Sequence, residues 1–411
     1  MANEITTAID IGSHSVYTLI AQKKEDLLPQ IIGVGSVRSN GIRKGVVVDI
    51  GDAQASIADS IRIAERGAGV KVSKATVGVG GSHISAQASH GVIAVSRADG
   101  EISPDDIERV IGAAQTFSLP SNREIIHVIP REFIIDGEGG IKDPLGMKGV
   151  RLETNALIIS GATSYIKNLH KALNGVGVEA ESVVVDTIAA TKAVLTKRQK
   201  ELGVVCLDIG GGTTGVTVYE EGDLLQTITL PLGGAHITSD IAIGFRIPID
   251  VAENIKFEYG AAETSEIGKR DVIELSHIDG QESGTVSRKE LCEIMEARLS
   301  EIFDLSNKEL KKIGKEAFLP GGVVLIGGTA KIPHIVDLAK KKMRLPVQIG
   351  FPREVEGIVE RVDDPVYSTA LGLIFWGMEE RGEAGEGFMP NIPSFNNSVR
   401  QMQKWFRAFL P

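Results

Sequence analysis

The sequence predicts an α/β protein built from two duplicated domains, with a smaller α+β subdomain inserted in the first half. Three observations support this prediction. A strand, a tight turn with the pattern Asp-x-Gly and a second strand occur near the N-terminus and again in the middle of the chain. A third glycine-rich turn follows a later apolar strand. Between the two copies lies a segment of alternating strands with one well-marked helix.

The repeated hairpin covers residues 8–20 in the first copy and residues 204–219 in the second. Each copy has an aspartate near the end of its first strand, Asp10 or Asp208, and a glycine two positions later. Glycine permits the positive φ that such a turn needs and lets a ligand approach the backbone. The repeat therefore predicts a duplicated pair of domains.

The chemistry of the two hairpins favours a phosphate site that also holds a metal ion. Backbone N–H groups and hydroxyls at the turns are donors for an anion. The carboxylates of Asp10 and Asp208 would repel a bare phosphate, but they fit if Mg²⁺ lies between them and the phosphates, held partly through water. The turn 327–330 adds a third candidate wall. One such hairpin is a weak signal because tight turns commonly contain Asp and Gly, whereas three sites together are a strong one.

Two inserted units interrupt the two-domain pattern. The first covers about residues 84–161 and contains the apolar stretches 125–129 and 132–136, which predict two strands. Ser103 and Asp106 form a capping box that marks the start of a helix. The expected domain boundaries are 1–83 with 162–202 for the first domain and 203–240 with 319–378 for the second.

The second inserted unit covers about residues 241–318 and contains a long amphipathic helix that follows Ser287. Arg298 lies in the middle of the apolar stripe of this helix. It either extends from the edge of the core and pairs with a carboxylate such as Glu301, or it binds a partner protein. The sequence alone favours the ion pair.

Composition restricts the function classes. The 411 residues carry a net charge of −10, which argues against nucleic acid as the main partner. Two cysteines, Cys206 and Cys292, do not make a disulfide framework. The N-terminus lacks the basic region of a signal peptide, and no apolar run approaches the ~18 residues of a membrane span. We expect a cytosolic protein, or one held at a membrane surface.

The amino-acid composition changes at residue 379 and again at residue 398. Residues 379–397 are rich in Gly, Glu, Pro, Asn and Ser, which predicts a flexible linker. In residues 398–411 apolar side chains recur on one helical face, and the basic side chains lie off that face. This pattern predicts an anchor on an anionic membrane surface; a terminal helix docked on the protein is the alternative. The apolar positions of the anchor are Val399, Met402, Trp405, Phe406, Phe409 and Leu410.

The three glycine sites resemble the phosphate-one, phosphate-two and adenosine motifs of the actin, hexokinase and chaperone ATPase superfamily. Within it, the chain is most similar to the FtsA family of bacterial cell-division proteins, over nearly its whole length. Two similar stretches, His127–Phe133 and Asp143–Leu152, lie in the insert and are specific to that family, because actin, sugar kinases and chaperones lack them. Further similar stretches are residues 31–36, 41–46, 239–242, 252–256 and 365–373.

The resemblance implies an actin-like ATPase fold with ATP and Mg²⁺ in the cleft between the domains. Asp10 and Asp208 would contact Mg²⁺, in part through water, and Asp186 is the candidate for orienting the attacking water. Family hairpins often carry a lysine where this chain has Ser15, so we expect slow ATP hydrolysis at most. The implied nucleotide-binding residues are Asp10, Gly12, Ser13, Asp208, Gly210, Gly211, Gly212, Thr213, Thr214, Glu253, Lys256, Gly327, Gly328 and Thr329.

The resemblance also implies partners and a location. The partners are FtsZ, bound near Arg298 and Glu301, further copies of the chain in a filament, later division proteins and anionic lipid. The location is the cytoplasmic face of the membrane at the division septum, and the first insert would sit on the opposite side of its domain from the usual actin subdomain. Two alternatives stay open: a pilus-assembly adaptor similar to PilM, and a small-molecule kinase of the same fold. The C-terminal tail argues against both.

Overall fold

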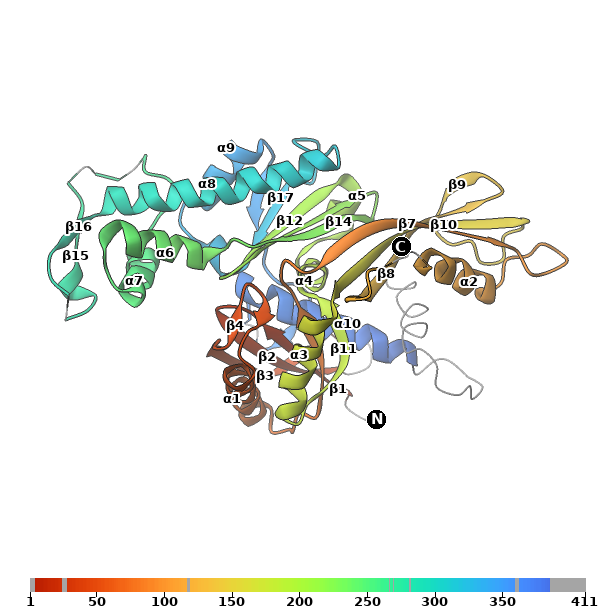
Figure 1. Ribbon diagram of the computed structural model, residues 1–411, viewed down its shortest axis with the longest axis horizontal. Helices are drawn as coiled ribbons and strands as arrows, with labels where there is room; N and C mark the ends of the chain where they lie inside the picture. The colour runs from red at the N-terminus through yellow and green to blue at the C-terminus, as the bar shows by residue number, and fades with distance from the viewer. Residues whose placement is uncertain are drawn as a thin grey trace.

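The computed structural model describes residues 4–23, 28–116, 119–265, 267–268, 270–280, 282–358 and 362–384. These residues form two lobes, each built on a twisted sheet, and two smaller units that lie at opposite ends of the long axis of the molecule (Figure 1).

The sheet of the first lobe has the strand order β11-β6-β1-β2-β3-β19. Its centre is an antiparallel meander, β1 (Glu4–Ile11), β2 (Ser15–Lys23) and β3 (Gln30–Arg38). The parallel strands β6 (Lys74–Val79) and β11 (Glu179–Val185) extend one edge, and β19 (Glu356–Gly357) extends the other. The other elements of this lobe are the hairpin β4 (Ile42–Arg43) and β5 (Val46–Val47), and the helices α1 (Ile50–Ala68), α3 (Thr163–Gly175) and α4 (Asp186–Val194). The short helix α5 (Lys197–Leu202) follows α4 and packs against the sheet of the second lobe, although the expected boundary at residue 202 had placed it in the first.

The sheet of the second lobe has the order β14-β13-β12-β17-β18. It repeats the first lobe in sequence and direction: a meander of β12 (Val204–Ile209), β13 (Thr214–Glu220) and β14 (Asp223–Leu230), then the parallel strands β17 (Val323–Ile326) and β18 (Val347–Ile349). The short helix η2 (Gly328–Lys331) and α9 (Ile335–Met343) follow β17, and η4 (Pro365–Tyr367) precedes the last helix. The matching topology confirms the predicted duplication.

The first insert is an α+β unit with an antiparallel sheet of order β7-β10-β8-β9. Its elements are β7 (Ser85–Ala94), α2 (Pro104–Gln115), β8 (Arg123–Ile135), β9 (Glu138–Ile141) and β10 (Arg151–Ala162). The predicted capping box is present, because the Ser103 hydroxyl accepts from the Asp106 N–H and the Asp106 carboxylate accepts from the Ser103 N–H. The two strands expected around Pro130 form one strand with a shift in register there. A bulge accommodates a proline, which has no N–H to donate.

The second inserted unit joins β14 to β17. It contains α6 (Gly234–Phe245), α7 (Ile249–Tyr259), the two-stranded sheet of β15 (Val272–Glu274) and β16 (Thr285–Ser287) with η1 (Leu275–His277) between them, and the long helix α8 (Arg288–Lys312). The Ser287 hydroxyl accepts from the Glu290 N–H at 3.3 Å and caps α8, as the sequence predicted.

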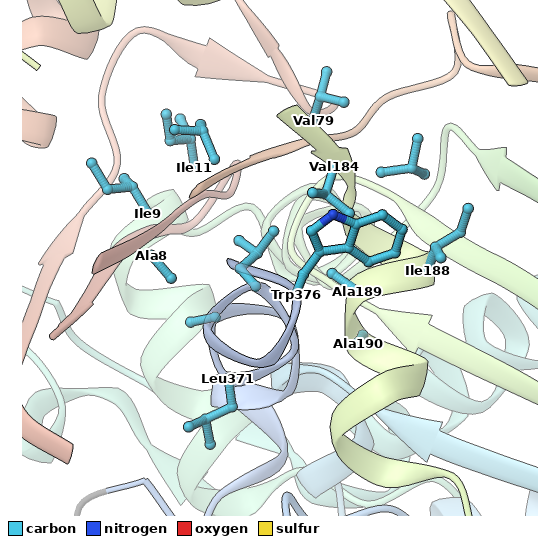
Figure 2. Packing of buried hydrophobic residues seen from close by; sticks show 14 of the residues in the cluster. Ala8, Ile9, Ile11, Val79, Val184, Ile188, Ala189, Ala190, Leu371 and Trp376 are labelled. Atoms are coloured by element: carbon cyan, nitrogen blue, oxygen red, sulfur yellow. The ribbon is translucent and has the colours of Figure 1, made fainter. Parts of the chain in front are cut away.

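The last described helix, α10 (Ser368–Ala384), packs mainly on the first lobe, whereas the expected boundary at residue 378 had assigned it to the second. Figure 2 shows Trp376 of α10 directed toward Val184 and Ala189. At Gly372 a Cβ would lie 1.8 Å from the Ala189 carbonyl oxygen, so only glycine permits this approach of α10 to α4. The helix also continues through residues 379–384, which had been expected to belong to the linker.

No helix in the described ranges has both the length and the apolar character needed to cross a membrane. The predicted anchor, residues 398–411, lies outside the described residues, as does the rest of the linker after residue 384.

Candidate functional site

The two Asp-x-Gly hairpins have the same turn geometry. In the first, Ile11 pairs with Val16 and the Gly12 N–H donates to the Ser15 carbonyl oxygen at 3.1 Å. In the second, the Gly210 N–H donates to the Thr213 carbonyl oxygen at 3.0 Å. These two N–H groups close the turns, so the donors left for an anion are those that follow along each turn.

The tips of the two hairpins touch each other across the cleft between the lobes. A Cβ at Gly211 would lie 2.7 Å from the His14 Cβ, and a Cβ at Gly212 would lie 2.7 Å from the Ser13 hydroxyl oxygen. Glycine at both positions is therefore required by the close approach of the two lobes.

A cavity of about 150 Å³ lies beside these tips. An adjoining hollow of about 420 Å³ shares Ser13, His14 and Glu253 with it, which extends the space available to a ligand. The structure brings thirteen of the fourteen predicted nucleotide-binding residues to the lining of the cavity, and Asp186 with them. These residues are Asp10, Gly12, Ser13, Asp186, Asp208, Gly210, Gly211, Gly212, Thr213, Glu253, Lys256, Gly327, Gly328 and Thr329.

The exception is Thr214. Its side chain is buried, and its hydroxyl donates to the Leu232 carbonyl oxygen at 2.8 Å, so it holds β13 in place and does not face the cavity.

Three carboxylates meet at the floor of the cavity. Burial, and next to it the charge of Asp208, raises the pKa of Asp10 to about 8. Burial raises the pKa of Asp208 to about 6, although a hydrogen bond from Thr369 opposes the shift. Burial and the two neighbouring carboxylates raise the pKa of Asp186 well above its ordinary value. A cluster of this kind needs a proton or a cation to offset the mutual repulsion.

This donor set fits Mg²⁺ together with phosphate. Within the described ranges, no three acidic, histidine or cysteine side chains are arranged to hold a metal ion by themselves. Mg²⁺ usually takes one or two protein carboxylates and completes its shell with water and substrate phosphates. Asp10 and Asp208 are the two carboxylates contributed by equivalent positions of the hairpins.

Asp186 is the first residue of α4, directly after β11. Its Oδ1 atom is buried without a hydrogen-bond partner. A Cβ at Gly78 would lie 2.1 Å from Oδ1, and a Cβ at Gly80 would lie 2.3 Å from Oδ2. The end of β6 therefore lacks side chains where the carboxylate lies, and Asp186 lines the cavity with a buried carboxylate oxygen that has no hydrogen-bond partner.

Glu253 and Lys256 form a wall of the cavity from α7. The Lys256 ammonium donates to Glu253 at 2.7 Å and to the Thr238 hydroxyl at 2.8 Å, and the lysine is only 6% exposed. Burial lowers the pKa of Lys256, while Glu253 opposes the shift. Although residues three apart on a helix commonly form exposed ion pairs, this pair is largely buried and lines the cavity.

The third glycine turn packs against the second hairpin. A Cβ at Gly327, whose φ is +82°, would lie 2.5 Å from Asp208 Oδ1. The Thr329 hydroxyl donates to the Gly210 carbonyl oxygen at 3.3 Å. The turn thus borders the cavity and supports the phosphate hairpin at the same time.

The sequence prediction did not include every residue of the lining, and four of those it left out make hydrogen bonds at the site. Gly45, in the turn between β4 and β5, donates its N–H to the Ser13 hydroxyl at 2.8 Å. The N–H groups of Gly234 and Ala235, at the start of α6, donate to the carbonyl oxygens of Gly210 and Gly211. Thr369 donates to Asp208 at 3.5 Å. Signals were present for Gly45 and Thr369, which lie in the family-similar stretches 41–46 and 365–373, and for α6, which begins at the Gly233-Gly234 pair.

Arg298 lies far from this cavity, on α8. Its guanidinium donates to both oxygens of Asp240, at 2.7 and 3.0 Å, and also pairs with Glu301. The predicted ion pair is confirmed, with Asp240 as a second partner. Beside it Ile243 is 76% exposed, so an apolar surface borders the charged cluster.

Comparison with known proteins identifies the family. A family model described as "Cell division protein FtsA" matches residues 205–372, and one described as "SHS2 domain inserted in FTSA" matches residues 81–160. The chain is 35% identical to the cell division protein FtsA of Pseudomonas aeruginosa over 93% of this chain and 91% of that protein. It is 38% identical to FtsA of Bacillus subtilis (90% and 83% covered) and 33% identical to FtsA of Escherichia coli (98% of both covered).

Solved structures show the fold. A chain of a PilM–PilN type IV pilus biogenesis complex has a TM-score of 0.64 at 15% identity, with 92% of this chain and 98% of that chain covered. MreB5 of Spiroplasma citri bound to ADP has a TM-score of 0.55 at 14% identity, with 93% and 99% covered. These likenesses support an actin-like ATPase fold with two duplicated domains and an insert, and the identities above show that the chain belongs to the FtsA family of cell division proteins.

Proposed function

We propose that this chain binds Mg·ATP between its lobes, polymerises on the cytoplasmic face of the cell membrane, tethers FtsZ filaments there and helps to recruit later division proteins. The observation that carries the nucleotide part is the pair of facing hairpins, each with a buried carboxylate at the same position of the same turn. The MreB5 structures of similar fold were solved with ADP and with AMPPNP, which is consistent with this assignment.

Asp10 and Asp208 would hold Mg²⁺, in part through water, and the turn amides beyond Gly12 and Gly210 would hold phosphate oxygens. When bound, the ion would neutralise phosphate charge. Asp186, with its unpartnered oxygen, would accept a hydrogen bond from the attacking water. Among the described residues that line the cavity, Lys256 is the one lysine or arginine, and it is already paired with Glu253. We therefore expect slow hydrolysis, because charge neutralisation is a large part of phosphoryl-transfer catalysis.

Equilibrium dialysis with labelled ATP and Mg²⁺ tests the nucleotide assignment. We expect saturable uptake by the full chain, and strong weakening by Asp208→Ala. Asp337→Ala, which removes a half-exposed carboxylate on α9, is the matched control and should bind as the parent does. No uptake by the parent would refute the proposed nucleotide site.

The FtsZ-binding surface is proposed around Arg298, Glu301 and Asp240. Arg298→Glu should abolish pelleting with FtsZ polymers, because it reverses one charge and leaves the two carboxylates without their cation. The exchange Arg298→Asp with Asp240→Arg is the matched control, because it preserves the ion pair. If the exchange variant is as stable as the parent and still fails to bind FtsZ, the surface charge matters. If Arg298→Glu only unfolds the protein, the ion pair is structural.

The membrane anchor is proposed in residues 398–411. Burial of its apolar face contributes several kcal/mol at ~25 cal/mol per Å², and each basic residue adds about 1 kcal/mol at an anionic leaflet. Ordering the segment costs about 1 kcal/mol or more per residue. The net affinity of one tail is therefore small, and firm attachment requires the many tails of a polymer.

Sedimentation with anionic liposomes tests the anchor. Trp405→Glu should release the protein from the liposomes while ATP affinity stays unchanged. Gln401→Glu makes the same change of charge away from the apolar face and is the matched control. If both variants pellet as the parent does, the tail is not the anchor.

A further inference from the structure

The first insert makes a polar contact with the backbone next to the catalytic candidate. His127 lies on β8, within the insert, and its Nε2 atom accepts a hydrogen bond from the Val185 N–H at 3.1 Å. Val185 ends β11, and the next residue, Asp186, begins α4. A side chain of the insert is thus bonded to the residue that precedes the acid of the cleft.

The surroundings of His127 keep its ring neutral. The ring packs against Trp376 of α10, with centroids 5.2 Å apart. Desolvation among these elements lowers the pKa of His127 to about 4. A neutral imidazole has one nitrogen that accepts and one that donates, so the contact with Val185 places the proton on Nδ1.

The contact with His127 supports a helix start that has no side-chain cap. The first N–H groups of a helix have no partner within the helix, and Val185, the N-cap residue of α4, has no side-chain capping bond. Val185 also pairs with Val79 of β6, and the Thr187 hydroxyl bonds to the Thr227 hydroxyl, so the contact with His127 adds to these restraints. The Oδ1 atom of Asp186 has no hydrogen-bond partner. The direction of the Asp186 carboxylate therefore depends on the backbone at Val185, which His127 helps to hold.

The insert also contacts the second lobe. Lys142 forms an ion pair with Asp223, the first residue of β14, and it donates to the Arg131 carbonyl oxygen at 3.0 Å. Arg131 is on the same strand as His127. These contacts connect the second lobe to β8, the strand whose His127 contacts Val185.

We propose that His127 is a positioning residue for Asp186, which places the acid of the cleft under the control of the insert. This rests on the proposed function, because it assumes that Asp186 orients water at bound ATP. The hydrogen bond from Val185 sets the angle at which α4 leaves β11. A force on the outer surface of the insert, such as contact with a second copy of the chain, would change that angle.

Two variants separate the hydrogen bond from the volume of the side chain. His127→Gln keeps an acceptor close to the position of Nε2, whereas His127→Leu removes it at similar size. The measurements are the dissociation constant of Mg·ATP, the single-turnover rate of phosphate release, and hydrogen–deuterium exchange of the peptide that contains Val185.

We expect His127→Leu to slow phosphate release by roughly tenfold, because small displacements of a catalytic group have large effects on rate. Its Mg·ATP affinity should stay within about threefold of the parent, so that the loss lies in turnover and not in binding. The Val185 amide should exchange faster. His127→Gln should restore both the rate and the protection.

The proposal is overturned if His127→Leu keeps the parent rate, if the Gln and Leu variants are equally slow, or if the parent binds Mg·ATP without releasing phosphate. Failure of the parent to bind Mg·ATP would instead refute the proposed nucleotide site. If His127→Leu does not fold, His127→Phe keeps a ring against Trp376 without an acceptor and takes its place in the same comparison.

Discussion

The two lobes have the same sheet but accept their inserted units at different points. In the second lobe the insertion follows the third strand, β14, whereas in the first it follows the fourth, β6. Both insertions begin at a Gly-Gly pair beside the cleft: Gly80-Gly81, next to Asp186, and Gly233-Gly234, next to the Gly210 turn. The two lobes thus share the sheet and the hairpin. They differ in the strand after which the inserted unit begins.

The first insert is attached to its lobe through a shared core. Residues Ile129, Leu157 and Ile159 of the first insert belong to the buried core of the first lobe, although the insert has a smaller core of its own. Deletion of residues 84–161 would therefore open the core of the lobe, and substitutions of exposed residues are the better test of a role in filament contacts.

The largest expected effect concerns the packing of α10 against α4 in the first lobe. Gly372→Ala in the first lobe should lower the free energy of unfolding by about 3 kcal/mol, because α10 must move away from the Ala189 carbonyl. Gly244→Ala on α6 of the second lobe is the control. Its Cβ would meet only the end of the Ile294 side chain, 2.9 Å away, and it gains helix propensity. Denaturant unfolding measures the free energy of unfolding of both variants. Equal losses of stability would contradict the packing argument.

The next effect tests the equivalence of the hairpins. Asp208→Asn should weaken Mg·ATP binding more than Asp10→Asn at neutral pH, by about tenfold or 1.4 kcal/mol. The reason is that the pKa of Asp208 is raised only to about 6, whereas that of Asp10 is raised to about 8. Asp208 is therefore ionised before the ligand arrives, and Asp10 must first lose a proton. Isothermal titration calorimetry measures the Mg·ATP affinity of both variants. Equal losses of affinity would show that Asp10 and Asp208 act as a single site.

A third prediction concerns pH. A carboxyl pKa of about 8 means that the folded state binds this proton more tightly than the unfolded chain does. The contribution of this group to the free energy of unfolding is therefore present at low pH and is lost as pH rises through about 8. The expected loss is about 1 kcal/mol between about pH 7 and about pH 8.5. The histidines with lowered pKa values titrate below this window, whereas Lys200, whose pKa burial lowers to about 8, titrates within it with the opposite effect on stability. Thermal unfolding without nucleotide measures the slope, and the difference in slope between the parent and Asp10→Asn gives the contribution of Asp10. A slope unchanged in that variant would assign the titration to another group.

The smallest effect concerns the contact between the first insert and the second lobe. Lys142→Ala should cost about 0.5 kcal/mol of stability, because the ion pair with Asp223 is partly exposed. The exchange of Lys142→Asp with Asp223→Lys should restore the loss. A double-mutant cycle measures the coupling, and a coupling of zero would mean that the insert does not bind the second lobe through this pair.

The parts of this structure that sequence predicted are those specified by short-range chemistry. The hairpins follow from Asp, Gly and flanking apolar residues, and the start of α2 follows from Ser103 and Asp106. The placement of α10 did not follow, because an apolar helix does not encode which of two similar sheets it covers. Gly45 and Thr369 were missed for a related reason: each lies in a stretch similar to the family, 41–46 or 365–373, but reaches the site by long-range packing that the stretch itself does not specify.

The contact between the hairpin tips has a consequence for the exchange of nucleotide. Because Gly211 and Gly212 already rest on His14 and Ser13, the lobes cannot approach further at that point. We expect relative motion of the lobes to be a rotation about the tips, which would widen the space on one side of the contact as it narrows the other. If the proposed nucleotide leaves by this rotation, a neighbour that restrains the outer ends of both lobes would lengthen its residence time.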